Sequence, residues 1–331
     1  MAAETAESIR NESLLHAFVL DGRGGGAPLD WAGVRAWTAG DSRVWCDLNY
    51  ASAETRRWVQ SLADLPEAAR NAMLEIDTRP GSFEYSEGLL VILRAVNLNE
   101  GARPEDMISL RIWIDEHRIL TFRRWPLQSI QAMVAHLRDG EGPCNTGQLL
   151  SDLIGELSER IAQVDDQLNL RLSDLERTAD QLEKLVVEST LGDLRRSSAQ
   201  LRRYLGPQRE ALQRLQKYDG PLLTDRDRQD IHLHTDKIIQ CLEDIDLIRE
   251  QVMAYQDELF NRLAMEQNSR VYVLSIVAAI FLPLTFVTGL LGMNVGGIPW
   301  SASPLGFAAI VGLSVVIAVA LLLAFRRKRW L

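Results

Sequence analysis

Fifty-five consecutive residues of this chain carry no charge: from Val271 to Phe325 there is no Asp, Glu, Lys, Arg or His. The stretch contains two apolar runs, 271–291 and 305–325. A helix of about 21 residues spans roughly 30 Å, the thickness of the hydrocarbon core of a bilayer. The absence of charge therefore predicts two transmembrane helices.

Cysteine is also scarce, and no catalytic signature is present. Cys46, Cys144 and Cys241 lie far apart without any CxxC pair, which argues against a disulfide framework and fits a reducing cytoplasm. The glycines at 22 and 24–26 lack the GK[ST] ending of a phosphate loop, and neither GxSxG nor HExxH occurs. The sequence predicts no enzyme activity, and the glycine-rich segment is interpreted as a flexible turn.

The charges that are present are distributed unevenly. Residues 1–270 hold 45 acidic and 32 basic residues, a net charge of −13, and four basic residues follow at 326–329. An acidic soluble part repels phosphate, so we expect no nucleic-acid partner, but it can gather cations. Arg262 and Arg270 precede the first span and 292–304 has no Lys or Arg, so the positive-inside rule places both termini in the cytoplasm.

The first span has one face of small and mildly polar side chains. Two helices cannot enclose a polar path by themselves, so a pore would need several chains around an axis. The face follows a seven-residue repeat: Asn268, Val271, Ser275, Ala278, Leu282, Thr285 and Gly289. A pore lining and a contact face between membrane helices both fit this pattern, and periodicity alone does not separate them.

Residues 1–143 have the pattern of an α/β domain. Short runs rich in Val, Ile, Leu and Trp predict strands, and amphipathic runs predict helices. The predicted strands are Leu14–Leu20, Arg43–Tyr50, Leu89–Leu98, Ile108–Ile114 and Arg118–Arg124, and the predicted helices are Ala53–Leu62, Pro66–Leu74 and Leu127–Arg138.

Residues 144–270 predict a helical stalk that resembles a coiled coil. Apolar residues three and four apart, from Leu150 to Val186, predict one helix capped by Asn145 or Thr146. A second helical stretch, 195–216, is expected to break at Gly206-Pro207. A third helix should start near Thr224 and enter the first span unbroken, and a rod of about 60 residues, roughly 90 Å, needs lateral packing.

The segment 268–294 reads NSRVYVLSIVAAIFLPLTFVTGLLGMN. The string PLTF at 283–286, the triplet Gly292-Met293-Asn294 and the basic tail 326–331 resemble the CorA family of divalent-cation transporters. The order of α/β domain, helical stalk and two spans also resembles that family. The string GMN-x-GGIP at 292–299 is similar to its zinc-transporting ZntB branch, whereas Tyr before the triplet and Phe after it, usual in magnesium-type members, are absent.

The resemblance implies an α+β membrane protein that forms a CorA-like homopentamer in the bacterial inner membrane. The first span would line the pore, the second would lie outside it, and the outer loop 292–304 would place the Gly292, Met293 and Asn294 triplet at the mouth. The transported ion would be zinc, without a resident cofactor. By position, Asn294 would ring the entrance, and the conduit would be lined by Asn268, Val271, Leu274, Leu282 and Thr285.

The chemistry of the spans limits the mechanism. Zinc prefers Cys, His and carboxylate ligands, and 271–325 contains none. Stripping water from a divalent ion there would be costly, so we expect a largely hydrated ion. This does not select zinc over magnesium or cobalt, so a magnesium or cobalt channel stays an alternative. A membrane-anchored coiled-coil sensor or scaffold is a further alternative, of another class.

Two pairs of side chains near the start of the third helix are candidates for a cytosolic metal site. Asp230 with His234, and His232 with Asp236, are i, i+4 pairs, while His232 and His234 point apart. Cys241 lies too far along the helix to share an ion with His234. A solvated stalk surface is the favoured interpretation of the same residues.

Overall fold

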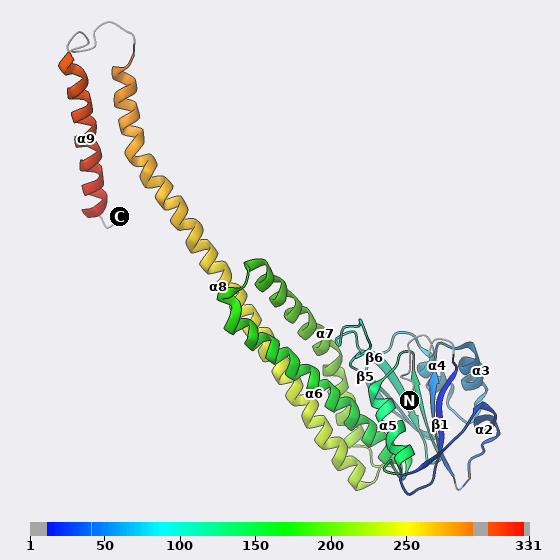
Figure 1. Cartoon of the computed structure of the whole chain (residues 1–331). Helices are drawn as coiled ribbons and strands as arrows, with labels where there is room; N and C mark the ends of the chain where they lie inside the picture. Colours follow the sequence, from blue (N-terminus) through cyan, green and yellow to red (C-terminus); the bar gives the residue numbers. More distant parts are fainter. Residues whose placement is uncertain (1–11, 41, 294–303, 328–331) are drawn as a thin grey trace. The chain divides into compact units, whose positions relative to one another are not determined.

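The structure is a computed structural model that describes residues 12–40, 42–293 and 304–327 (Figure 1). The chain divides into two compact units, Met1–Ala254 and Tyr255–Leu331. The first contains the α/β domain and most of the stalk, and the second contains the two long apolar segments.

A seven-stranded mixed sheet forms the centre of the first unit, in the order β2-β1-β3-β7-β6-β5-β4. Neighbouring strands are antiparallel except β3 and β7, which pair in parallel. The bounds are β1 Leu14–Leu20, β2 Gly26–Pro28, β3 Arg43–Asn49, β4 Gly81–Tyr85, β5 Gly88–Ala95, β6 Ile108–Ile114 and β7 Arg118–Arg123. Every residue of β5 and β6 is buried, because helices cover both faces of the sheet.

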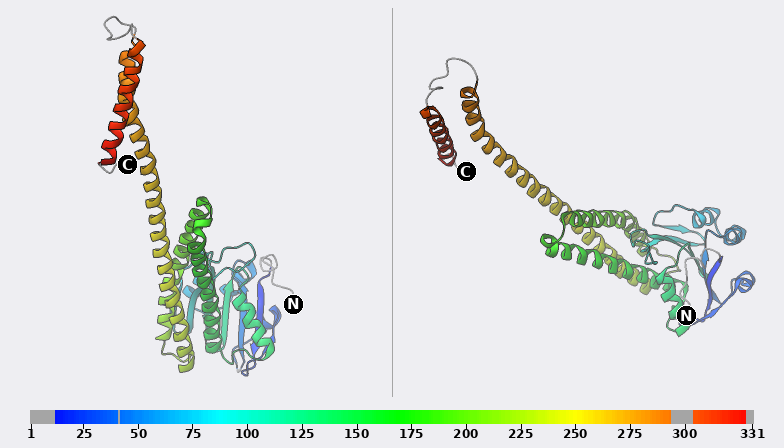
Figure 2. Two further views of the ribbon diagram at one scale, coloured as in Figure 1. Left: turned by 60° about the vertical axis from the view of Figure 1, so that its left-hand side comes forward. Right: turned by 45° about the horizontal axis from the view of Figure 1, so that its top comes forward.

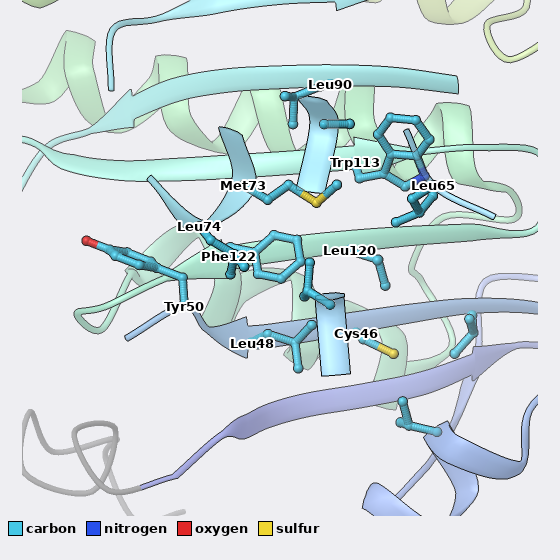
Figure 3. Close-up of a cluster of buried hydrophobic side chains, with 14 of the residues drawn as sticks. Cys46, Leu48, Tyr50, Leu65, Met73, Leu74, Leu90, Trp113, Leu120 and Phe122 are labelled. Carbon is cyan, nitrogen blue, oxygen red and sulfur yellow. The ribbon is translucent and has the colours of Figure 1, made fainter. Parts of the chain in front are cut away.

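One face of the sheet packs on three short helices, α2 (Trp31–Ala36), α3 (Ala53–Ser61) and α4 (Glu67–Leu74). Cys46, Leu48 and Phe122 from the strands meet Met73 of α4 in this core (Figure 3). The opposite face lies toward α5 (Gln128–Asp139) and the stalk. Side chains alternate between the faces along each strand, which is why the apolar patterns predicted the strands.

A buried ion pair lies at the sheet's centre. Arg123 donates through Nε to Asp47 Oδ2 at 2.9 Å, and both side chains are fully buried. Thr121 donates its hydroxyl to Asp47 Oδ1 at 2.7 Å, and Trp45 Nε1 donates to that hydroxyl oxygen at 3.1 Å. Hydrogen bonds to both carboxylate oxygens compensate for the water that Asp47 loses.

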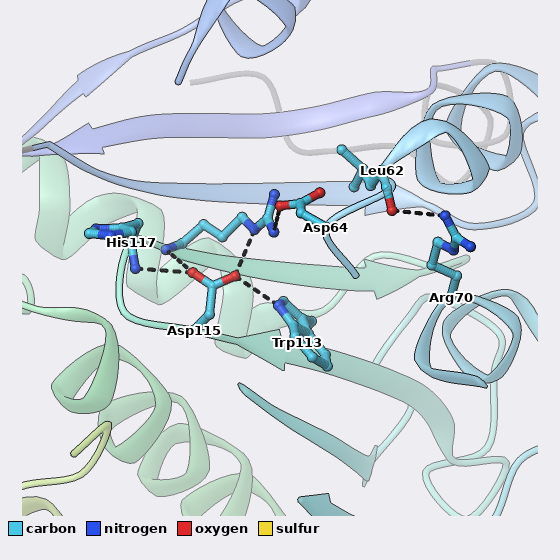
Figure 4. Close-up of polar contacts among 7 residues, drawn as sticks. Leu62, Asp64, Arg70, Trp113, Asp115 and His117 are labelled. Carbon is cyan, nitrogen blue, oxygen red and sulfur yellow. Dashed lines mark hydrogen bonds and ion pairs between the residues drawn. The ribbon is translucent and has the colours of Figure 1, made fainter. Parts of the chain in front are cut away.

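The turn between β6 and β7 is held by one carboxylate, Asp115 (Figure 4). It accepts the backbone N–H groups of His117 and Arg118 at 3.0 and 2.9 Å, and the indole N–H of Trp113 at 2.9 Å. Arg118 also donates Nε to Asp115 at 2.7 Å and pairs with Asp64. Asp64, Asp115, His117 and Arg118 line a cavity of 470 Å³, and the pairing with Arg118 leaves Asp115 unsuited to holding a metal.

Three long helices form the stalk: α6 (Thr146–Thr178), α7 (Lys184–Gln216) and α8 (Asp225–Leu291). Asn145 caps α6 by accepting the N–H of Gln148 at 2.8 Å. Glu159 of α6 pairs with Lys237 of α8. Gly155 lies against His234, and Asp165 faces Asp244. The facing partners are 78 or 79 residues apart, so α6 and α8 run in the same direction.

The predicted elements of the first 143 residues are all present. The largest difference is at β5, which ends at Ala95 rather than Leu98. Gly22 and Gly24 have positive φ in a turn that leads into β2, not into a helix, as expected for a segment that is not a phosphate loop. The elements that the sequence did not predict, β2, α2 and β4, have at most six residues each.

Two predictions in the stalk were wrong. The first helix does not extend to Val186: α6 ends at Thr178, a short 3₁₀ turn (Ala179–Gln181) follows, and the chain reverses into α7. Val186 is 45% exposed, so the apolar repeat continues there without a partner. The second helix does not break at Pro207, because Leu205, Gln208 and Leu212 stay buried on one continuous face. Tertiary packing there outweighs the backbone bond that Pro207 cannot make.

Candidate ion pathway

The second unit consists of the last part of α8 and of α9 (Pro304–Arg327). In the described residues these are the helices long and apolar enough to cross a membrane, and their most apolar windows are not buried within the chain. Leu274 and Leu282 are 69% and 71% exposed. Side chains this apolar need lipid or another protein surface around them.

The predicted pore stripe lies along α8 on one exposed face. α8 continues through Pro283 without interruption as far as Leu291. Each predicted lining residue is exposed in the single chain: Asn268, Val271, Leu274, Ser275, Ala278, Leu282, Thr285 and Gly289.

The partly covered residues of the same segment follow a different stripe: Ile276, Ile280, Leu284, Val287 and Leu291. At 100° per residue, this covered stripe lies about half a turn from the predicted pore stripe. Figures 1 and 2 show α9 beside this part of α8. α9 has a matching row of covered residues, which are Gly306, Ile310, Ser314, Ile317, Ala318, Leu321 and Phe325. We infer that the covered stripe faces α9, which leaves the pore stripe free for other chains or for water.

The covered stripe was not anticipated, although the sequence carries a signal for it. Its members are larger aliphatic residues spaced three and four apart, whereas the pore stripe has smaller ones. A comparison of side-chain size on opposite helix faces would have separated them.

The pore stripe is chemically mild. The hydroxyl of Ser275 donates to the carbonyl of Val271 at 2.8 Å, so its oxygen is left as a weak acceptor. Around Gly289 there is open space where a side chain would start. Groups of this kind can hydrogen-bond water, but they cannot replace the hydration shell of a divalent ion.

At the end of α8, the predicted triplet is described only in part. The N–H of Gly292 donates to the carbonyl of Thr288 at 2.9 Å and closes the last turn. A Cβ at Gly292 would lie 3.0 Å from that carbonyl oxygen, so glycine fits best. Met293 is 48% exposed, and Asn294 lies outside the described residues.

The candidate cytosolic metal residues do not converge on one point. His232 Nδ1 lies 3.7 Å from Asp236 Oδ1, with both side chains exposed. His234 is half-buried against Gly155, and burial lowers its pKa while Asp230 opposes the shift. Across the described part of the chain, no three His, Cys, Asp or Glu side chains are grouped so that they could hold a metal.

An α/β domain, a helical stalk and two apolar C-terminal helices define a membrane protein whose long helix is shared between a soluble and an apolar part. The family model described as "CorA-like Mg2+ transporter protein" matches residues 40–327. The chain therefore belongs to the CorA family of divalent-cation transporters, and it is a transporter rather than an enzyme.

Relatives match along their whole length. The chain is 34% identical to the divalent cation transporter CmaX of Pseudomonas aeruginosa over 328 residues, which covers 98% of this chain and 99% of CmaX. It is 30% identical to the zinc transport protein ZntB of Pectobacterium carotovorum, with full coverage of both.

Solved structures give the same fold. The full-length CmaX structure matches with a TM-score of 0.84, and covers 96% of this chain and 98% of CmaX. The CorA magnesium transporter of Methanocaldococcus jannaschii matches with a TM-score of 0.80 at 21% identity, over 95% of this chain and 98% of its own. These matches confirm the predicted fold of α/β domain, stalk and two C-terminal apolar helices.

Proposed function

We propose that the protein is a homopentamer in the bacterial inner membrane that transports zinc along an axis lined by α8. The observation that carries this proposal is the uncharged pore stripe, exposed on the side of α8 away from α9. A pore made of copies of this stripe would place Asn268 to Gly289 around water and α9 against lipid. The basic residues that flank the spans favour an orientation with both termini in the cytoplasm.

The choice of zinc rests on two similarities. The residues after the triplet read VGGIPW, similar to the zinc-transporting branch, and full-length relatives are named ZntB. CmaX, at higher identity, is named for divalent cations without a single ion. A magnesium or cobalt channel is therefore the competing proposal, and the two differ only in the ion.

The mechanism follows from the lack of charge. No side chain from 271 to 325 can replace the water around a divalent ion, so the ion moves with most of its hydration shell. Asn294 amides and backbone carbonyls at the mouth would hydrogen-bond that shell. Affinity for cations would come from the acidic soluble part, with its charge of −13, because opposite charge raises the local ion concentration.

Uptake by proteoliposomes tests the proposal. Purified protein should carry zinc into vesicles, and excess magnesium should compete weakly. Asn294→Ala should abolish uptake while the oligomer stays intact by size-exclusion chromatography. Ser301→Ala, in the same loop but outside the triplet, is the matched control and should transport normally. Full zinc uptake by Asn294→Ala would refute the role of the mouth, and stronger transport of magnesium or cobalt would replace zinc as the substrate.

A further inference from the structure

The contact line between α6 and α8, here called the α6–α8 seam, has three polar positions spaced close to seven residues apart. Glu159 faces Lys237 in the middle, an ordinary ion pair. On one side of it Asp152 faces Asp230, and on the other Asp165 faces Asp244. A repeat of about seven residues is typical of helices that pack side by side. At both outer positions an acid meets an acid, where a packed seam would favour opposite charges.

Asp165 is the more deeply enclosed of these acids. Asp165 is only 3% exposed, and its Oδ1 atom has no hydrogen-bond partner. The neighbouring Cys241 of α8 is equally buried. Among the described residues, the ionisable groups that act directly on Asp165 are Asp244 across the seam and Asp166 on its own helix, and both are acidic. No cation from α6, α7 or α8 is among the groups that act on it.

Asp165 is buried, whereas Asp244 lies at the exposed edge of the seam. Two carboxylates this close repel each other when both are ionised, and the buried one is destabilised most, unless a cation joins them. A proton is the smallest such cation, and it turns the repulsion into a hydrogen bond. We propose that Asp165 is a proton-binding site: its carboxylic acid O–H donates to the carboxylate of Asp244 and holds α6 against α8, and loss of that proton loosens the seam. This proposal is independent of which ion the protein transports.

The titration of Asp165 supports the geometry. Burial, with the charges of Asp244 and Asp166, raises its pKa from 3.8 to about 7. A carboxyl group with a raised pKa in the packed state stabilises that state most at low pH, and this stabilisation is lost as the pH rises to about 7. The seam would therefore respond to pH near neutrality.

A divalent metal bridge is a weaker explanation for the same residues. Burial and the nearby acids raise the pKa of the Cys241 thiol to about 12, so it stays protonated and is a poor ligand. Asp165 and Asp244 alone make two ligands, and no set of three is present in the described residues. Zinc sites in proteins rarely use so few.

Amide hydrogen exchange on the full-length oligomer in detergent tests the proposal. After correction for the intrinsic effect of pH on exchange, opening of residues 161–169 and 241–248 should rise about tenfold between pH 6 and pH 8. Asp165→Asn, which keeps the shape of the protonated acid, should abolish this rise. Asp166→Asn removes an exposed charge one residue away, so it should move the rise to slightly lower pH without abolishing it. Asp152 lies about two heptads away, so its own titration should not affect these peptides.

A second measurement does not depend on Asp165→Asn folding. The infrared absorption of a protonated carboxyl group should disappear from the unsubstituted protein with a midpoint near pH 7, and Asp244→Asn should shift that midpoint to lower pH. Two results would overturn the proposal. One is an unchanged pH response in Asp165→Asn. The other is restoration of the closed seam at pH 8 by zinc or magnesium, which would make the site a metal site.

Discussion

The two compact units accommodate charged and apolar side chains in opposite ways. At the centre of the first unit's sheet, charge is buried together with its partners: Asp47 is fully buried, and Arg123 and Thr121 donate hydrogen bonds to its oxygens. In the second unit, charge is absent from 271 to 325, and large aliphatic side chains point outward. Both arrangements follow one rule, because polar groups need partners and apolar groups need to avoid water.

This difference shows which surfaces a single chain covers with its own helices and which it leaves exposed. The sheet of the first unit is covered on both faces by its own helices. Within the described residues, the pore stripe of α8 is left exposed. One copy therefore explains the packing of the first unit, whereas the proposed transport path needs several copies.

The sharpest test of the comparison contrasts the two faces of α8. Cysteine at Gly289, on the pore stripe, should react with a membrane-impermeant thiol reagent, because that face would meet water. Cysteine at Val287, on the covered stripe, should stay unmodified. Both variants would be made in a chain with Cys46, Cys144 and Cys241 changed to Ala, and labelling would be followed by mass spectrometry in lipid vesicles. Equal labelling, or labelling of position 287 alone, would contradict the assignment of the two faces.

The buried ion pair should give the next largest effect. Asp47→Ala leaves Arg123 charged and without its carboxylate partner inside the sheet, so we expect a loss of about 3–5 kcal/mol in the free energy of unfolding. The control is Asp64→Ala, which removes the partner of Arg118 at a site 61% exposed. Exposed pairs contribute only about 0–1 kcal/mol, so this variant should unfold nearly normally. Chemical denaturation monitored by Trp fluorescence would compare them, and similar losses would show that burial does not set the cost.

Substitution of Asp152 should give the smallest effect, because its charge is only half-buried and water still partly stabilises it. Burial, with Asp230 and Asp227, raises its pKa from 3.8 to about 6. Its contribution to stability is therefore lost as the pH rises from about 4 to about 6, and it stays lost above that. At pH 7.5 Asp152→Asn should be more stable by about 1 kcal/mol, less than the full shift suggests because the side chain is only half-buried. Asp225→Asn, at a fully exposed side chain, should show no such gain in the same thermal unfolding series.

Most of the architecture could be predicted from periodicity. The strands Leu14–Leu20 and Ile108–Ile114 match their predicted bounds, because residues buried on one or both faces leave a direct record in the sequence. The end of α6 left no such record: the apolar repeat passes through Ala179 and Leu182 without proline or glycine, although the chain turns there. Where a helix ends for lack of a partner, only the tertiary structure shows it.

The position of the pore stripe was predictable from the sequence, whereas the acid pair of the α6–α8 seam was not. Heptad spacing identified the pore stripe from Asn268 to Gly289, whose lining role stays a prediction. The acid pair Asp165 and Asp244 was not identified, since it is formed by residues 79 positions apart. The sequence showed them as ordinary stalk carboxylates, and only the parallel alignment of α6 and α8 brings them together.

That parallel alignment has a consequence for how such chains can diverge or be engineered. Because α6 and α8 run the same way, α7 must return between them, with connections at 179–183 and 217–224. Side-chain contacts such as Glu159 with Lys237 fix the register of α6 against α8. The lengths of the two connections are therefore not needed to define that register. Doubling a loop costs only about 0.6 kcal/mol in closure entropy. The hairpin tip at 179–183 is thus the natural place for descendants to gain residues, or for a fluorescent reporter to be inserted.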